Sequence, residues 1–287
     1  MTDQMTSLHD IRDNKEDLLI FLHIPKTAGT SFYKSVASQL KNDETLLLYG
    51  FKRTSAMISE EIQSMDASSR NRIRFIAGHQ VWYGIHNLFP ERRPRYVTFL
   101  RDPVSRVVSE YWKIMRTPQH ALHSLFMETK PSVTDFLSGK ITPLTTNHMT
   151  VFLGRSKVSE WHNIEQCARN DPTLLGQAFM NLRKFWYVGL KESFLSDLHR
   201  LGRLLKVECD ELHHNKPEEI PDARKCISLQ EIEMCAMNNQ MDCLLYHSAT
   251  LMHDTQEPQS FVLDLSSDRG TRLESERISK DKNLAVN

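Results

Sequence analysis

The chain has 287 residues, 40% of them hydrophobic, and its 36 Lys and Arg residues balance 36 Asp and Glu residues. A chain of this length can bury a large core within one domain. Its zero formal charge excludes the strong global field that recruits nucleic acid or an anionic membrane. No apolar run approaches the about 18 residues of a membrane span, and residues 2–17 lack the apolar core of a signal peptide. We therefore expect a soluble, cytoplasmic protein that binds no nucleic acid.

Strand-like and helical segments alternate over the first part of the chain. The apolar patterns predict, in chain order, strand 18–24, helix 30–41, strand 45–49, helix 55–66, strands 73–77 and 95–100, and helix 103–116. The remainder is mostly helical, with predicted helices at 132–139, 159–168, 171–183, 191–206 and 228–252 and one further strand at 185–189. This alternation predicts an α/β fold: a P-loop-like, mostly parallel central sheet flanked by helices, with a helix-rich C-terminal half.

The same pattern divides the chain into a polar segment 1–17, a domain 18–252, and a loosely ordered tail 253–287 in which 260–265 could add a short strand. The five cysteines are odd in number and show no Cys-x-x-Cys spacing. Neither a zinc site nor a full disulfide framework is therefore indicated. Cys235 and Cys243 both fall on the last predicted helix and are expected to be core thiols.

The loop after the first strand is expected to bind an anion. Residues 18–32 read LLIFLHIPKTAGTSF, an apolar strand followed by small and hydroxyl residues that open a helix. Unpaired backbone N–H groups and the dipole at a helix start favour a phosphate. The triphosphate pattern G-x-x-x-x-G-K-[ST] is not met, because aligning Gly29 on its second glycine puts Ile24 and Thr30 at the first glycine and the lysine. The shorter cradle around Lys26 suits one phosphate; the alternative is an ordinary turn capped by Thr or Ser.

A second strand-turn-helix unit carries an arginine at its turn. Residues 95–116 read RYVTFLRDPVSRVVSEYWKIMR, and Pro103 can open the helix. Arg101 ends the strand and Ser109 lies about two helical turns further on. A guanidinium and a hydroxyl could therefore converge on a second anion. Alternatively, Arg101 pairs with Asp102 or with a carbonyl group, and Ser109 is a small surface residue.

Together, KTAGTS and RDPVSRVVS resemble the two signatures of sulfotransferases that use 3′-phosphoadenosine 5′-phosphosulfate (PAPS). More narrowly, they resemble the branch that contains the heparan sulfate 2-O- and 6-O-sulfotransferases and their bacterial relatives. The resemblance spans roughly residues 18–252. It implies that PAPS is the sulfuryl donor and that the acceptor is a hydroxyl of a glycan or glycoside. It places the 3′-phosphate on Arg101 and Ser109. The 5′-phosphosulfate falls on Lys26, Thr27, Ala28, Gly29, Thr30 and Ser31.

The resemblance also identifies a base. Residues 74–80 read RFIAGHQ, and the Gly-His that the family carries at this point falls on His79. An alcohol is a poor nucleophile until its proton is removed, and imidazole titrates near pH 6.5. The 2-O enzymes have a second histidine two residues earlier; Ala77 stands there, so a two-histidine arrangement is not expected. Lys26 is expected to neutralise charge on the leaving phosphate oxygen, in a reaction that needs no metal.

Two further segments resemble parts of the same family. Residues 145–154 (TTNHMTVFLG) resemble its acceptor-side segment N-x-Q-T-R-x-L-x-G, with Met149 and Val151 in place of the usual Gln and Arg. Residues 237–246 resemble its closing helix, in which packing and capping roles are expected for Asn239, Asp242 and Tyr246. The aromatic residues that follow the base could stack on a sugar ring or belong to the core; they are Trp82, Tyr83 and His86.

Two other functions are compatible with these motifs. In a P-loop kinase or nucleotidase, Asp102 would bind magnesium and His79 would have no role; here Asp102 is expected instead to order its turn. A degenerate relative would only bind a nucleotide or a glycan. A cluster of arginines before the second motif could attract an acidic acceptor such as a uronate-bearing sugar, or form a solvated surface; it consists of Arg92, Arg93 and Arg95.

Overall fold

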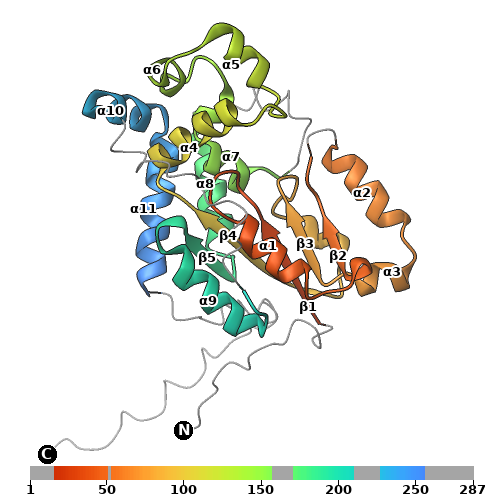
Figure 1. Ribbon diagram of the computed structural model, residues 1–287. Helices are drawn as coiled ribbons and strands as arrows, with labels where there is room; N and C mark the ends of the chain where they lie inside the picture. Colours follow the sequence, from red (N-terminus) through yellow and green to blue (C-terminus); the bar gives the residue numbers. More distant parts are fainter. Residues whose placement is uncertain (1–15, 51–52, 157–170, 210–226, 256–287) are drawn as a thin grey trace, which may run out of the picture.

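The computed structural model describes residues 16–50, 53–156, 171–209 and 227–255. A central sheet is covered by helices (Figure 1). Its strands are β1 (Asp17–Leu22), β2 (Thr45–Leu47), β3 (Phe75–Gly78), β4 (Arg93–Leu100) and β5 (Tyr187–Leu190). The strand order is β2-β3-β1-β4-β5, and each of the four pairings is parallel. The predicted parallel α/β sheet is thus confirmed.

The helices of the first half connect these strands. They are α1 (Thr30–Ala37), α2 (Ser55–Ser64), α3 (Ala67–Arg72) and α4 (Pro103–Arg116). The helices that follow form most of the C-terminal half, which is helix-rich as predicted: α5 (His123–Thr129), α6 (Val133–Leu137), α7 (His148–Gly154), α8 (Pro172–Leu182), α9 (Phe194–Leu205), α10 (Leu229–Asn238) and α11 (Gln240–Thr255). Short 3-10 turns are η1 (Asn42–Glu44), η2 (Ile85–Leu88), η3 (Pro143–Thr145) and η5 (Lys191–Ser193).

Both faces of the sheet are buried, which explains the nearly continuous apolar strands. Successive side chains of β1 point to opposite faces. Leu18, Ile20 and Leu22 pack in the cluster that contains residues of α2, α7, α8 and α11. Leu19 and Phe21 pack in the cluster formed with α1 and α9, which lie together on one face in Figure 1. A third apolar cluster, around α4, α5, α6 and α10, lies apart from the sheet.

Helix α4 has the predicted bounds, whereas the predicted helix 228–252 does not exist as one element. It breaks at Asn239, whose buried side-chain amide donates to the Thr145 carbonyl at 2.7 Å and accepts from the Asn147 N–H at 2.9 Å. These long-range hydrogen bonds separate α10 from α11. Cys235 in α10 is a core thiol as expected, while Cys243 in α11 is only half-buried.

Other differences concern short elements. Helices α3, α5 and α7 were not among the predicted ones, and most strands and helices differ by one to a few residues at their ends. Helix α3 begins where Asp66 accepts a hydrogen bond from the Ser69 N–H at 2.9 Å. The predicted polar segment 1–17 is described only from residue 16. The predicted helix 159–168, the strand 260–265 and the tail from 256 onward lie outside the described residues.

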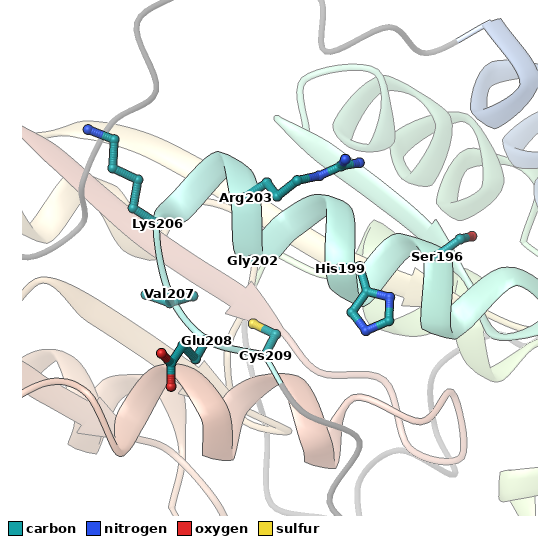
Figure 2. A pocket seen from close by; sticks show the side chains of 8 residues that line it. All are labelled: Ser196, His199, Gly202, Arg203, Lys206, Val207, Glu208 and Cys209. Atoms are coloured by element: carbon teal, nitrogen blue, oxygen red, sulfur yellow. The ribbon is translucent and has the colours of Figure 1, made fainter.

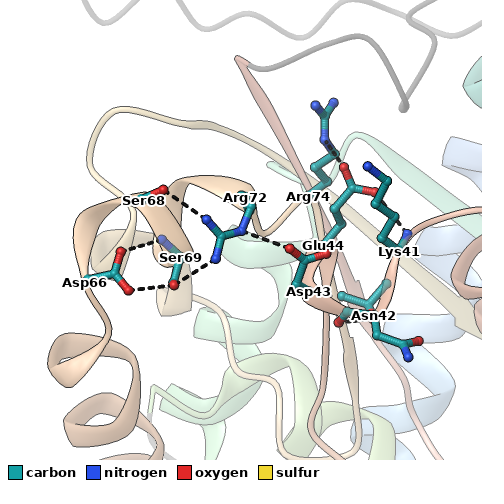
Figure 3. A network of polar contacts seen from close by, with 10 residues as sticks. Lys41, Asn42, Asp43, Glu44, Asp66, Ser68, Ser69, Arg72 and Arg74 are labelled. Carbon is teal, nitrogen blue, oxygen red and sulfur yellow. Dashed lines mark hydrogen bonds and ion pairs between the residues drawn. The ribbon is translucent and has the colours of Figure 1, made fainter.

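Paired charges occupy the amino edge of the sheet, where the parallel strands begin. In Figure 3, Arg72 forms an ion pair with Asp43 at 2.9 Å, and Arg74 forms one with Glu44 at 3.2 Å. These contacts join η1 and α3 to the starts of β2 and β3. The amino edge is thereby closed by side chains that bind one another.

The arginine cluster considered for acceptor binding also lies at the amino edge. Arg93 and Arg95 both pair with the carboxylate of Asp17, Arg95 at 3.2 Å. Arg92 donates to the carbonyl groups of Asn71 and Ile73 at 3.1 Å each. These arginines thus have structural partners at the amino edge, whereas the motif residues lie at the opposite end of the strands.

Candidate active site at the carboxyl edge

The three motifs meet at the carboxyl edge, where the parallel strands end. From β1 the chain goes first to β2 and β3 on one side and then to β4 and β5 on the other. This change of direction creates a topological switch point at the end of β1, the position where open parallel sheets bind ligands. The loop 23–29 follows β1 at that point, and the residues after β3 and β4 flank it.

The loop after β1 has a conformation suited to an anion. Lys26 and Ala28 adopt left-handed backbone angles, with φ of 72° and 70°. Alternating left-handed residues turn successive N–H groups toward one side, as in an anion-binding nest. Thr27 between them is fully buried, and its hydroxyl donates to the Ile24 carbonyl at 2.8 Å. Thr27 therefore holds the loop closed, and its side chain is not directed at a ligand.

Helix α1 starts at Thr30, and no side chain caps its amino end. Gly29 occupies the N-cap position, and there is no acidic residue in the first turn. The alternative of an ordinary turn capped by Thr or Ser is therefore wrong. A Cβ atom at Gly29 would lie 2.3 Å from Cζ of Phe21 and 2.8 Å from Cδ2 of His23, so only glycine fits. The first N–H groups of α1 are left for a ligand.

Arg101 connects the second motif to this loop. Its Nη1 donates to the Lys26 carbonyl oxygen at 3.1 Å, which is the carbonyl pairing considered as the alternative for this residue. Burial lowers the pKa of Lys26 to about 8, although the nearby Glu110 carboxylate partly offsets this. A bound anion would favour the charged ammonium. Lys26 and Arg101 thus form one cationic group where β1 and β4 end.

Helix α4 places the other residues of the second motif. Asp102 caps it by accepting from the Ser105 N–H at 2.9 Å, as expected for a residue that orders the turn. Ser109 is buried in the helix, with 8% of its surface exposed. The next residue, Glu110, is buried and lies 3.4 Å from His120. Burial acts to raise the pKa of Glu110, but the hydrogen bond with His120, followed by the charges of Lys26 and Arg106, holds that pKa below its usual value.

His79 lies beside a second histidine that motif analysis did not identify. Strands β1 and β3 pair Leu22 with Gly78, so the residues that follow, His23 and His79, leave the sheet side by side. Their ring centroids are 4.5 Å apart. Ala77 leaves no histidine two residues before His79, as the sequence indicated, and the second imidazole comes instead from the end of β1. The register between β1 and β3 would have shown that His23 and His79 lie side by side, but the motifs do not contain it.

The hydrogen bond of His79 determines which ring nitrogen can accept a proton. Its Nδ1 lies 2.7 Å from the carbonyl oxygen of His23. Because a carbonyl oxygen only accepts, Nδ1 carries the hydrogen and Nε2 keeps its lone pair. Burial lowers the pKa of His79, so the ring is neutral near pH 7. This is the state that a general base requires.

Two tyrosines complete an aromatic cluster around these histidines. The Tyr49 hydroxyl lies 3.0 Å from Nδ1 of His23, and its ring is 5.1 Å from that of His79. Tyr33 of α1 lies 4.7 Å from Tyr49. The chain after β2 reaches this position because Gly78 lets it pass close by: a Cβ there would lie 2.1 Å from the Leu48 carbonyl oxygen. We call His23, Tyr33, Tyr49 and His79 the ring cluster.

The acceptor-like segment 145–154 reaches His79 through the residue that follows it. Most of the segment forms α7, in which Met149 and Val151 are buried. Arg155 then donates from Nη2 to the carbonyl groups of His79 and Val81. Asp242 of α11 caps α7 by accepting from the N–H groups of Met149 and Thr150 at 3.0 and 2.7 Å. The expected capping role of Asp242 is confirmed.

Of the aromatic residues after His79, Trp82 is buried, and Tyr83 and His86 are half-buried beside core residues. Trp82 is 6% exposed. Tyr83 packs on Phe185 with ring centroids 6.2 Å apart, and Nδ1 of His86 lies 2.9 Å from the Tyr96 hydroxyl. Of the two interpretations of these three residues, the structure supports the core.

A surface groove elsewhere does not belong to the site. Figure 2 shows its lining, which runs along α9 and the residues after it: Ser196, His199, Gly202, Arg203, Lys206, Val207, Glu208 and Cys209. Gln39, beyond the end of α1, exchanges hydrogen bonds with the Glu208 backbone at 2.7 and 3.0 Å. Helix α1 runs away from the carboxyl edge, so this groove lies toward the amino edge.

The described residues contain neither a group that could hold a metal ion nor a helix that could span a membrane. Within residues 16–50, 53–156, 171–209 and 227–255, no three His, Cys, Asp or Glu side chains are grouped so that they could hold a metal ion. No helix in those same ranges has the length and apolar character needed to cross a membrane.

Comparison with known proteins identifies relatives of the chain. The sequence model of the sulfotransferase family matches residues 9–168. Heparan-sulfate 6-O-sulfotransferase 3-B of Danio rerio is 28% identical over 119 residues, which is 37% of this chain and 28% of that protein. Heparan-sulfate 6-O-sulfotransferase 1 of Gallus gallus is 29% identical over 115 residues, 35% of this chain and 28% of that protein. The matched part is thus under a third of the relatives' length.

Among solved structures, the sulfotransferase from Alicyclobacillus acidocaldarius is similar over 80% of this chain and 96% of that chain. Its TM-score is 0.35 and its sequence identity is 12%.

Proposed function

The chain belongs to the sulfotransferase family, and from this premise we propose that it transfers the sulfuryl group of PAPS to a hydroxyl of a carbohydrate acceptor. The observation that carries the proposal is the contact between Arg101 and the Lys26 carbonyl at 3.1 Å, which unites the two anion-binding motifs. His79 is linked to the same loop through the carbonyl of His23. A donor with phosphate at both ends of a nucleoside fits two such motifs.

Each motif is assigned to one end of the donor. The uncapped start of α1 and the N–H groups of the loop 26–31 bind the 5′-phosphosulfate. Arg101 and Ser109 bind the 3′-phosphate, with the planar guanidinium providing two parallel donors. The loop fits this assignment because it has no acidic residue in the first helical turn and holds Lys26 beside it.

His79 and Lys26 then have complementary roles in the transfer. Nε2 of His79 accepts the proton of the acceptor hydroxyl while that oxygen forms its bond to sulfur. Lys26 and the loop N–H groups stabilise the charge that grows on the departing phosphate oxygen as the sulfur–oxygen bond breaks. Holding donor and acceptor in line supplies the orientation that the reaction requires. None of these steps calls on a metal ion.

The names of the relatives, which specify heparan sulfate, support a carbohydrate acceptor. A screen with labelled PAPS should therefore include heparan sulfate chains alongside uncharged glycosides. The His79→Ala variant should lose about a hundredfold or more of the transfer rate while nucleotide affinity is unchanged. His199→Ala is the matched control, because His199 lies on the exposed side of α9 and should retain full activity.

Nucleotide binding separates the proposal from its main rival. Calorimetry should show that 3′,5′-bisphosphoadenosine binds at least tenfold more tightly than AMP, because charged hydrogen bonds contribute about 1.5–3 kcal/mol each. Arg101→Ala should abolish this preference, whereas Arg93→Ala at the amino edge should leave it intact. A kinase or nucleotidase would instead bind ATP with magnesium and ignore the 3′-phosphate. Equal affinity for the bisphosphate and AMP would contradict the proposal.

The third possibility, a relative that binds without turnover, gives another result. Such a protein would prefer the bisphosphate over AMP and yet transfer no label to any acceptor. In such a protein, His79→Ala would not change the transfer of label, because there is no transfer for His79 to catalyse. The geometry of His79, neutral and with Nδ1 already occupied, favours the enzyme.

A further inference from the structure

The His79 imidazole is held by one hydrogen bond and two neighbouring rings. Its Nδ1 donates to the His23 carbonyl at 2.7 Å, and a ring held only at that point could turn about the bond. The His23 ring lies against it at 4.5 Å with a tilt of 42°. The Tyr49 ring stands edge-on at 5.1 Å and 84°. His79 is thus enclosed by rings from the ends of the two adjacent strands.

The His23 ring is itself fixed from several sides. It is 4% exposed and stacks on Phe21 with centroids 4.9 Å apart. Its Nδ1 lies 3.0 Å from the Tyr49 hydroxyl. The backbone of Gly29 presses on the ring so closely that a Cβ atom would lie 2.8 Å from Cδ2. A buried ring with this many contacts can serve as a rigid wall for its neighbour.

We propose that His23, tied by the Tyr49 hydroxyl, is a positioning residue for His79. The His23 ring keeps the His79 imidazole in the orientation in which Nδ1–H meets the backbone carbonyl and Nε2 is presented to the acceptor hydroxyl. The inference rests on the proposed function only for the role of His79 as the base. The ring geometry itself belongs to the chain without any ligand.

The protonation states of His23 and Tyr49 suit a role in positioning His79 and do not suit a second base. Burial, followed by the nearby His79, holds the pKa of His23 well below its usual value, so its ring is neutral. A neutral ring does not repel His79 when that residue becomes protonated. Burial also raises the pKa of Tyr49, so its phenol stays protonated and can either donate to Nδ1 of His23 or accept from it, according to the His23 tautomer. The hydrogen bond therefore persists across the neutral pH range.

Strand order explains why three separate segments form this device. Strands β2, β3 and β1 are consecutive in the sheet, and Tyr49, His79 and His23 follow their respective ends. Parallel register brings the three rings to one edge. A change at the end of any one of these strands would therefore alter the surroundings of the His79 ring.

Nitrogen-15 NMR of histidine-labelled protein tests the proposal without any enzymatic assay. Protonated and unprotonated ring nitrogens of neutral imidazole have widely separated shifts, and the His79 signals are those absent from His79→Gln. At pH 8, the original chain should show one His79 tautomer, with hydrogen on Nδ1. His23→Ala should give averaged shifts, because the wall is gone. Tyr49→Phe and His23→Phe, which keep the ring and lose the hydrogen bond, should give a smaller shift in the same direction.

The matched control is Tyr33→Phe, which removes a hydroxyl from the same ring cluster but from a ring that does not touch His79. It should leave the His79 signals unchanged. Combining Tyr49→Phe with His23→Phe should add nothing beyond either alone, because both remove the same hydrogen bond. A purely structural role would lower the unfolding temperature without moving the His79 tautomer.

Two results would overturn the inference: an unchanged single tautomer in both Tyr49→Phe and His23→Phe, or an equal perturbation by Tyr33→Phe. Should His23→Ala not fold, the two phenylalanine variants still decide. Calorimetry with 3′,5′-bisphosphoadenosine on the same variants keeps the two proposals apart. Loss of the preference over AMP contradicts the proposed function, whereas the NMR result alone decides the positioning of His79.

Discussion

The two edges of the sheet use charge in opposite ways. At the amino edge, Asp17 binds two arginines, and the ion pairs of Arg72 and Arg74 close the starts of β2 and β3. At the carboxyl edge, Lys26 and His79 are largely withdrawn from water, and burial is the largest influence on the pKa of each. Charges that pair with one another stabilise a fold. Titratable groups whose pKa is shifted by burial, as at the carboxyl edge, are typical of functional sites.

The backbone follows the same division. The carboxyl edge holds Lys26 and Ala28 in left-handed conformations and a glycine that no other residue could replace without a clash. Strain of this kind costs free energy and is found at functional sites. In Figure 3, by contrast, the side chains at the amino edge form short local pairs. The comparison predicts that substitutions at the carboxyl edge impair ligand binding, while those at the amino edge affect stability alone.

The largest effect is expected for Gly29→Ala. The added methyl group would overlap the Phe21 and His23 rings, so the loop must move. We expect a loss of about 2 kcal/mol in the free energy of unfolding and a loss of 3′,5′-bisphosphoadenosine binding, measured by chemical denaturation and calorimetry. Gly176→Ala is the control, since Gly176 is exposed within α8 and a Cβ there meets nothing within 4 Å; the substitution should stabilise the helix by up to about 1 kcal/mol. Unimpaired binding by Gly29→Ala would refute the assignment of this loop.

The titration of Lys26 is expected to change the affinity for 3′,5′-bisphosphoadenosine by about tenfold per pH unit above its pKa. With its pKa at about 8, Lys26 is protonated below that pH, and the bound anion raises its pKa further. Affinity for 3′,5′-bisphosphoadenosine should therefore be constant below about pH 7.5 on account of this group and fall about tenfold from pH 8.5 to 9.5. The ligand phosphates are already ionised there, because their second pKa is about 6.

Lys26→Arg separates this effect from others. Arginine stays charged over the whole range, so its affinity should be flat above pH 8. Lys26→Ala should bind weakly and equally at each pH. A decline of the same size in all three proteins would show that another group titrates.

The smallest effect is expected for Asp17→Asn at the amino edge. The substitution removes one charge that Arg93 and Arg95 share. Thermal unfolding should reveal a loss of about 1 kcal/mol, as is usual for partly exposed ion pairs. Nucleotide affinity should not change. A clear change in nucleotide affinity would contradict the conclusion that the amino edge contributes to stability alone.

The local features of the fold were predictable from the sequence because they depend on neighbours along the chain. Helix α4 was found with its bounds because Pro103 opens it and apolar residues repeat along one side. The start of α1 at Thr30 followed from the change between an apolar strand and a glycine loop. These signals extend over a few residues and survive in any tertiary context.

The remainder depended on contacts between distant segments. The break at Asn239 comes from hydrogen bonds to Thr145 and Asn147, more than ninety residues away in the chain. The pairing of His23 with His79 follows from the β1–β3 register, which no local pattern encodes. The arginines before β4 were ambiguous because only the strand direction reveals which edge they occupy. Lys26, Arg101 and His79, named from motifs, lie at the same edge of the sheet, and their assignment to the site stays a prediction; supporting partners such as His23 were not foreseen.

The cap on α7 bears on how much of this chain is needed for a working unit. The family match ends at residue 168, but β5 and Asp242 come later in the chain. A truncation at that point would remove β5, so that β4 becomes the edge strand of the sheet, and would leave α7 without its carboxylate cap. Since Arg155 extends from α7 to the backbone of His79, the stretch that the family model matches lacks contacts that help to hold the backbone at His79.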